Sequence, residues 1–145
     1  MKMKSLLLLL FILPAWGHAQ YDFTGTWEGT LTQDMGGYAP EYQFKLFLRQ
    51  EGNTITGRSY VKLGKIFAEM KLEGRLIGNK AIHWEETKII DHWKYENMEW
   101  CYKQANLFIV AEGKEVKLEG PWSGHTGVSD CIPGKIMLRR VSPRA

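Results

Sequence analysis

Apolar and polar side chains alternate through most of the chain after residue 23, and this period of two constrains the fold more than any other feature. The clearest run takes in every second residue from Ile66 to Leu76, and similar runs begin at Gly25 and Tyr42. Successive side chains of a β-strand point to opposite faces, so each run predicts a strand with one buried face. The chain is therefore predicted to be all-β.

Short turn signals separate these runs. Gly or Asn within residues 51–53, 77–80 and 112–114 can supply the positive φ that tight hairpins require. Such short connections make sequential strands antiparallel neighbours. Eight strands are predicted, and segment 91–100 forms either a short helical turn or an extension of a strand. The predicted strands cover residues 24–33, 42–50, 54–63, 67–76, 81–90, 102–111, 115–122 and 135–141.

Eight meandering strands in so small a domain would leave exposed edges if the sheet stayed flat. Closure into an antiparallel up-and-down barrel removes those edges and is the predicted fold, with a β-sandwich as the alternative. The pattern Gly-x-apolar-x-Gly recurs at residues 25–29, 74–78 and 120–124. It either marks strongly coiled strands or arises by chance in a chain with fifteen glycines.

The first nineteen residues have the three parts of a secretory signal peptide. Lys2 and Lys4 precede the apolar run 6–13, and a small-residue exit ends at Ala19. The run is shorter than the roughly 20 residues that span a bilayer, and Pro14 ends it. We therefore predict cleavage after Ala19. A single barrel domain, residues 20–145, would then work as a secreted or periplasmic protein with no transmembrane segment.

Charge and cysteine content narrow the expected partners. Cleavage would remove two of the nineteen basic residues and none of the sixteen acidic ones, which leaves a net charge of +1. This balance gives no electrostatic reason to expect a nucleic-acid partner. Cys101 and Cys131 predict one disulfide in an oxidising compartment. They precede the sixth and eighth strands, which begin at the same end of a meander, so the bridge would tie down one rim.

The segment Phe23-Thr24-Gly25-Thr26-Trp27, at the first predicted strand, resembles the opening of the calycin group, which includes lipocalins, fatty-acid-binding proteins and avidins. The segment Asn53-Thr54-Ile55-Thr56-Gly57 and the count of eight strands are most similar to the avidin and lipocalin branches. The resemblance implies an up-and-down barrel with Trp27 packed at the closed end. It also implies that Arg139 or Arg140 of the last strand lies across that ring.

The chain departs from each branch of the group. The positions with which avidins hold biotin fall on Gly29, Gln33 and Ser59, so biotin binding is not expected. The second lipocalin motif and its C-terminal helix are absent, and segment 34–40 is too short and glycine-rich for the helical lid of fatty-acid-binding proteins. The resemblance therefore implies a fold and leaves the ligand open.

Five metal-ligating residue types lie within ten positions. They are His83, Glu85, Glu86, Asp91 and His92. Strand alternation sends Glu86 to the face opposite His83 and Glu85, so no three of these converge without a bend, and we interpret them as solvent-facing positions beside a buried Trp84. No metal site, cofactor or catalytic residue is predicted. A paired-carboxylate hydrolase that uses two of Glu85, Glu86 and Asp91 is the only enzymatic hypothesis that the residues leave open.

Aromatic residues and hydrogen-bonding groups gather in segment 91–100. This composition suits a rim that stacks on a sugar or grips a ligand, and it equally suits a loop that folds back to cap the core. In an up-and-down meander the connections after the first and fifth strands emerge at the same end, which brings segment 34–40 close. The predicted ligand-binding residues are Tyr38, Asp91, Trp93, Tyr95, Asn97 and Trp100.

The leading functional hypothesis is a non-enzymatic binding module for a small apolar or amphipathic molecule or a glycan. The alternative is a protein-interaction module, such as an extracellular hydrolase inhibitor or an envelope partner. Bulky inward residues would fill a small eight-stranded interior and argue against a cavity, whereas an inward Glu86 beside Trp84 would argue for one. The bulky positions are Tyr42, Phe44, Leu46, Leu48, Met70 and Leu72.

Overall fold

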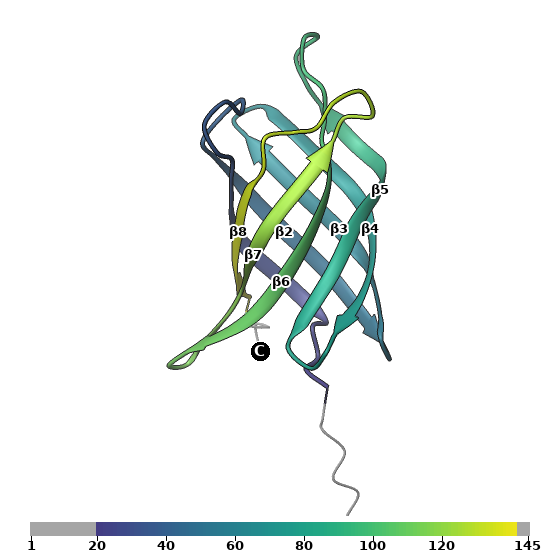
Figure 1. Ribbon diagram of the computed structural model, residues 1–145, viewed down its shortest axis with the longest axis vertical. Helices are drawn as coiled ribbons and strands as arrows, with labels where there is room; N and C mark the ends of the chain where they lie inside the picture. The colour runs from purple at the N-terminus through teal and green to yellow at the C-terminus, as the bar shows by residue number, and fades with distance from the viewer. Residues whose placement is uncertain (1–19, 142–145) are drawn as a thin grey trace, which may run out of the picture.

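Eight strands form one closed antiparallel barrel in the computed structural model, which describes residues 20–141 (Figure 1). Each strand pairs with its sequence neighbours, and β8 closes the barrel against β1. The predicted up-and-down barrel is confirmed, and the β-sandwich alternative is wrong. The predicted signal peptide, residues 1–19, lies outside the described residues. The strands are β1 (Gly25–Thr32), β2 (Glu41–Glu51), β3 (Thr54–Leu63), β4 (Ile66–Ile77), β5 (Ala81–Trp93), β6 (Tyr102–Glu112), β7 (Glu115–His125) and β8 (Gly134–Arg140).

Residues 91–93 of the segment 91–100 extend a strand, and residues 94–100 form a loop with a turn at residues 96–97. β5 continues to Trp93 along β4, with register shifts beside Met70 and Leu72. Against β6, however, β5 pairs only from Ala81 to Glu85. The two strands diverge beyond that point toward the upper end of the barrel in Figure 1. Residues 20–141 form no helix, and so none long and apolar enough to cross a membrane.

Inward-facing side chains fill most of the barrel. Trp84 and Phe44 stack with ring centroids 6.2 Å apart, and both are fully buried. The bulky positions expected to face inward are all buried: Tyr42, Phe44, Leu46, Leu48, Met70 and Leu72. Burying an apolar side chain of this size contributes about 1.5–3 kcal/mol before entropy is counted, so the alternating pattern supplies the core.

Arg140 covers the ring of Trp27 at the closed end. Its guanidinium carbon lies 4.6 Å from the Trp27 ring centroid, and its Nη2 donates to the carbonyl oxygen of Asp22. Trp27 is fully buried and donates from Nε1 to the carbonyl oxygen of Phe23 at 3.0 Å. The calycin resemblance left open which of two arginines lies there, and the structure selects Arg140. Arg139 instead contacts Glu115 on the outer surface.

Three glycines of the recurring pattern, Gly29, Gly74 and Gly120, lie where the backbones of neighbouring strands approach most closely. A Cβ on Gly29 would lie 2.0 Å from the carbonyl oxygen of Met137, and one on Gly120 would lie 1.9 Å from that of Asn106. Both distances are far below van der Waals contact. Because glycine has no Cβ, it allows the two backbones to approach this closely, and this is consistent with strong coiling of the strands at these positions.

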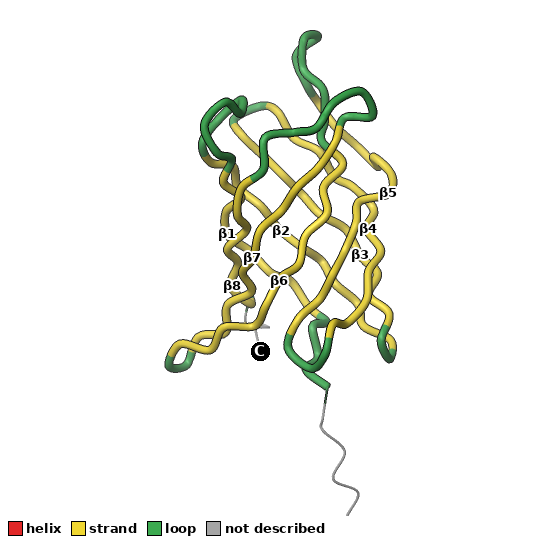
Figure 2. Tube along the Cα trace, in the orientation of Figure 1, coloured by secondary structure: helices red, strands yellow, loops and turns green. Residues whose placement is uncertain are grey.

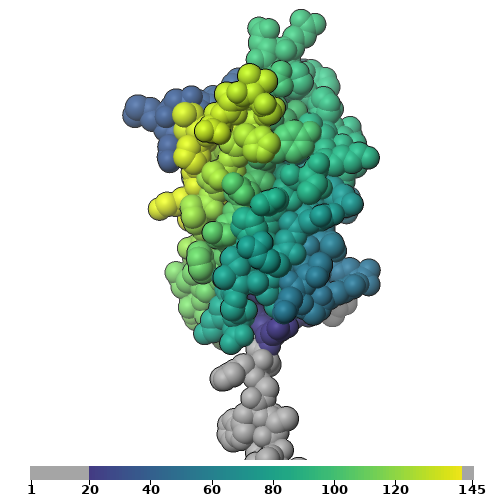
Figure 3. Space-filling model, turned by 45° about the vertical axis from the view of Figure 1, so that its right-hand side comes forward, coloured from purple at the N-terminus to yellow at the C-terminus, as the bar shows by residue number. Residues whose placement is uncertain are grey.

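The two ends of the barrel differ. Three long connections, residues 33–40, 94–101 and 126–133, emerge together at one end, and short hairpin turns occupy the other (Figure 2). The same loops crowd together in the space-filling view (Figure 3). The predicted disulfide joins Cys101 and Cys131 at this end, with Cα atoms 6.3 Å apart. We call this end the mouth.

Candidate functional site: a cavity at the barrel mouth

A cavity of about 220 Å³ lies inside the mouth. Apolar and aromatic side chains form most of its wall, and the disulfide contributes both cysteines. Its lining residues are Leu31, Gln33, Gly36, Gly37, Tyr38, Tyr42, Val61, Met98, Glu99, Trp100, Cys101, Lys103, Trp122, Thr126, Cys131 and Ile132. A concave, mostly apolar space with a few polar groups is the usual form of a small-molecule site.

Strand alternation explains how the wall forms. Leu31, Val61 and Trp122 each occupy an inward position near the mouth end of a strand, and all three are buried. The connections then close over them, with Trp100 held beside the disulfide. The Cys101–Cys131 disulfide joins residues 30 positions apart. In the chain-entropy model such a crosslink stabilises the folded protein by roughly 3–4 kcal/mol, so it holds two of the loops that form the wall together.

Gln33 fixes the loops around the opening. Its Oε1 accepts from the Tyr38 backbone N–H and the Tyr42 hydroxyl, both at 3.1 Å, and its Nε2 donates to the Ile132 carbonyl oxygen at 3.0 Å. Burial raises the pKa of Tyr42, so its hydroxyl stays protonated to higher pH than in water. Trp122 donates to the Thr32 carbonyl oxygen at 2.8 Å. The polar groups of this wall are therefore largely paired with one another.

A buried ion pair lies next to the cavity, because Lys103, which lines it, is paired with Glu86. Nζ of Lys103 lies 2.9 Å from Oε1 of Glu86, and the exposed fractions of the two side chains are 4% and 0%. The same Oε1 accepts from the Lys103 backbone N–H at 2.7 Å, and the Ser59 hydroxyl donates to Oε2. These contacts satisfy the carboxylate on both oxygens, as a buried charge requires.

The position of this pair follows from the divergence of β5 and β6. The backbone ladder ends at Glu85 and Gln104, so the next pair would be Glu86 with Lys103. Instead of a backbone carbonyl, the Glu86 side chain accepts the Lys103 N–H. The Glu86 carboxylate therefore does two things at once: it accepts the backbone N–H at the end of the ladder, and it pairs with the ammonium group of Lys103.

Two donors near the cavity have unused hydrogen-bonding capacity. An ammonium group carries three N–H bonds, and Lys103 directs two to Glu86 and, at 3.4 Å, to the carbonyl oxygen of Cys101. Nε1 of Trp100 is buried with no partner among residues 20–141. Buried donors of this kind ordinarily have a partner, so each is an attachment point for an acceptor.

The predicted ligand-binding residues all lie at the mouth end, but they do not form one cluster. Tyr38 and Trp100 line the cavity. Tyr38 also lines a neighbouring rim hollow of about 410 Å³ with Tyr95 and Asn97. Trp93 contacts Tyr95 edge to face, with ring centroids 4.9 Å apart. Asp91 lies on β5 opposite Glu69 and lines neither space.

Glu86 corrects one expectation from the sequence. The sequence pattern predicts a solvent-facing position for Glu86, yet the side chain points inward beside Trp84, whereas Glu85 is exposed. His83 contacts Glu85 and Asn106. Within residues 20–141, no three His, Cys, Asp or Glu side chains gather into a group that could hold a metal ion.

Sequence reasoning overlooked Lys103, although the pattern contained the signal. Lys103 shares its parity with Ala105 and Leu107, which are both buried. Glu86 likewise shares its parity with Trp84. Opposite charges at inward positions of two adjacent strands predict a buried ion pair, provided that the strand register is known.

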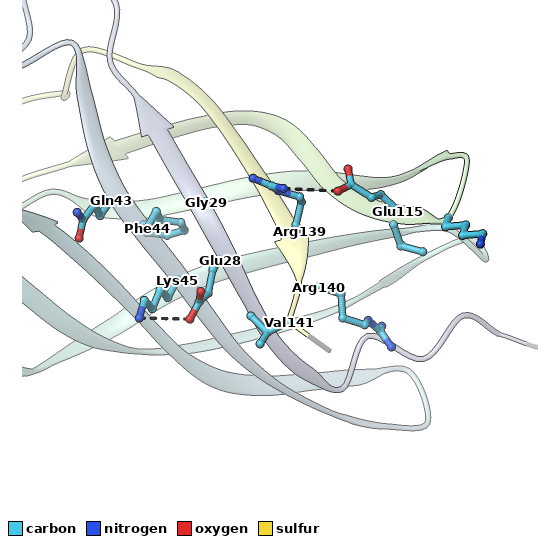
Figure 4. Close-up of a pocket in the computed structure, with 11 residues that line it drawn as sticks. Glu28, Gly29, Gln43, Phe44, Lys45, Glu115, Arg139, Arg140 and Val141 are labelled. Atoms are coloured by element: carbon cyan, nitrogen blue, oxygen red, sulfur yellow. Dashed lines mark hydrogen bonds and ion pairs between the residues drawn. The ribbon is translucent and has the colours of Figure 1, made fainter. Parts of the chain in front are cut away.

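A larger hollow of about 720 Å³ lies on the outer wall, beside Gly29 (Figure 4). Lys45 pairs with Glu28 at 3.3 Å and Arg139 with Glu115 at 3.5 Å, as the dashed lines show. The four paired side chains are solvent-exposed, and exposed ion pairs of this kind contribute little binding energy. Lys114 and Arg140 also line the hollow, whose wall is more polar than that of the mouth cavity. The smaller cavity at the mouth is the better candidate despite its volume.

The chain matches no known family model, and a search of curated proteins finds no similar sequence. The class is therefore defined by the architecture itself. The protein is an eight-stranded antiparallel closed barrel, which is consistent with a calycin-like fold.

Proposed function

We propose that this protein is a non-enzymatic binding module that holds a small apolar or amphipathic molecule in the mouth cavity. The observation that carries the proposal is a mostly apolar cavity, open at the mouth, with buried, partly unused donors in its wall. A lipocalin-like role is consistent with the closed barrel. A disulfide together with the predicted signal peptide supports a secreted or periplasmic location.

Cumene, a purely apolar probe, tests this function by isothermal titration calorimetry. We expect saturable 1:1 binding with a negative heat-capacity change, because apolar surface leaves water. Val61→Phe places a larger side chain in the cavity and should abolish binding. Glu28→Ala in the outer hollow is the control and should leave binding unchanged. Cumene binding that survives Val61→Phe but not Glu28→Ala would move the site to the outer wall.

A second candidate function is a protein-interaction module, such as an extracellular hydrolase inhibitor or an envelope partner. The observation that favours it is the exposure of apolar side chains on two mouth loops: Met35 is 100% exposed and Val128 is 96% exposed. The double variant Met35→Ser/Val128→Ser separates the candidates. A cavity-binding module keeps its affinity for cumene, whereas a protein-binding module loses its partner in a crosslinking assay on the host's extracytoplasmic fraction.

A further inference from the structure

We propose that the mouth cavity selects small neutral molecules that carry a hydrogen-bond acceptor, such as ketones, over acids and amines of the same size. This inference rests on the proposed function and adds the chemical class of the ligand. Its basis is the balance of charge and of hydrogen-bonding capacity around Lys103.

The charge of Lys103 is already compensated. Among the described residues that line the cavity, Lys103 is the only Lys or Arg, and Glu86 neutralises it at 2.9 Å. A carboxylate ligand would bring a second buried anion to this neutral pair and lose its hydration without a free counter-charge. An ammonium ligand would meet a carboxylate whose oxygens are occupied. Glu99 also lines the cavity but is exposed, so water screens its charge.

Two donors of the cavity wall have hydrogen-bonding capacity left. Lys103 has one N–H bond left, and Trp100 has its indole N–H. The amide and carboxylate acceptors beside these donors are already engaged: Glu86 accepts three bonds and the half-buried Gln33 accepts two. A ligand that accepts without donating or carrying charge therefore matches what the wall leaves vacant.

The volume limits the ligand to a small molecule. An apolar protein cavity of about 150 Å³ holds benzene, so 220 Å³ accommodates about nine non-hydrogen atoms. Cumene, acetophenone, benzoate and 1-phenylethylamine all have this size and share a phenyl ring with a short branched group. They differ mainly in charge and hydrogen bonding, with a planar branch in acetophenone and benzoate and a tetrahedral one in the other two, and they form a matched set of probes.

Calorimetric titration of the wild-type protein with the four probes at neutral pH tests the inference. Acetophenone should bind about tenfold more tightly than cumene, because a hydrogen bond from a charged donor adds to the same apolar contact. Benzoate and 1-phenylethylamine should each bind at least about tenfold more weakly than acetophenone. Equal binding of acetophenone and cumene, or benzoate or amine binding as tight as acetophenone, would overturn the inference and leave the proposed function standing. Binding of none of the four would overturn both.

Two variants assign the selectivity to the ion pair. Glu86→Gln keeps the side-chain shape but removes the compensating anion, so benzoate should overtake acetophenone by about tenfold. The double variant Lys103→Met/Glu86→Gln removes both charges and should lose most of the preference for acetophenone over cumene. The exposed pair Glu112–Lys117, at 2.9 Å, supplies the control double variant Glu112→Gln/Lys117→Met, which should keep all four affinities. If Glu86→Gln does not fold, the double variant still decides: an unchanged acetophenone preference refutes the assignment.

Discussion

Lys103 and Glu86 meet inside the barrel with Nζ and Oε1 2.9 Å apart, at the point where the β5–β6 ladder ends. The pair replaces backbone hydrogen bonds that the diverging strands no longer make. A buried pair of this kind contributes little net stability compared with an apolar pair, but losing one partner leaves an uncompensated charge.

Lys103→Met should therefore destabilise the protein strongly, by about 3–5 kcal/mol, because Glu86 stays buried without its cation. The double variant Lys103→Met/Glu86→Leu should recover much of that loss. Guanidinium unfolding measures both, and Lys117→Met at the exposed pair is the control, which should leave the unfolding midpoint nearly unchanged. Additive losses in the double variant would mean that the two charges are not coupled.

Removal of the disulfide should loosen the mouth. Cys101→Ser/Cys131→Ser is expected to cost about 3–4 kcal/mol, since the crosslink closes a loop between residues 30 positions apart. The measurement is chemical unfolding of the double variant against wild type. Thiol labelling of the unreduced wild-type protein is the companion test, and modification of both cysteines would contradict the bridge.

Adjacent arginines provide a matched test of the closed end. Arg140→Ala should cost about 1–3 kcal/mol, because it removes the cation over Trp27 and the hydrogen bond to Asp22. Arg139→Ala changes an exposed side chain and should stay within about 0.5 kcal/mol of wild type. Thermal unfolding distinguishes them, and equal losses would show that Arg140 has no special role.

Much of the fold could be predicted because its causes are local. Alternation and hairpin turns placed all eight strands to within three residues, and the Cys positions indicated the crosslinked rim. The end of the β5–β6 ladder at Glu85 and Gln104 could not be predicted, since it depends on packing between strands and not on the local pattern. Without the β5–β6 register, the sequence does not show that Glu86 and Lys103 lie opposite each other, so it does not predict the buried ion pair.

Tyr42 should make stability sensitive to alkaline pH. Burial raises its pKa above the ordinary value of 10.0, so the folded state favours the protonated hydroxyl. Its contribution is complete below pH 10 and is lost as pH rises through the folded pKa. The difference in urea midpoint between wild type and Tyr42→Phe should shrink above pH 10. A difference that stays constant with pH would contradict this assignment.

Exposed aromatics at the rim test whether binding extends beyond the cavity. Trp93 and Tyr95 are 41% and 52% exposed, so replacing either by Ala should cost no more than about 1–2 kcal/mol. Each change should weaken binding of 2-undecanone, which is too long for the cavity, more than binding of acetophenone. If either variant instead loses the roughly 3–5 kcal/mol typical of a buried aromatic, the segment is a core cap.

The indole N–H signals of the five tryptophans in residues 20–141 give the most direct test of the central claim, because they report from known places in the barrel. Trp100 and Trp122 line the mouth cavity, whereas Trp27 is buried at the closed end. In a ¹H–¹⁵N titration with acetophenone, we expect saturable shifts of the Trp100 and Trp122 signals and a stationary Trp27 signal. Shifts at Trp27 as large as those at Trp100, or no shift at Trp100 and Trp122, would contradict that claim.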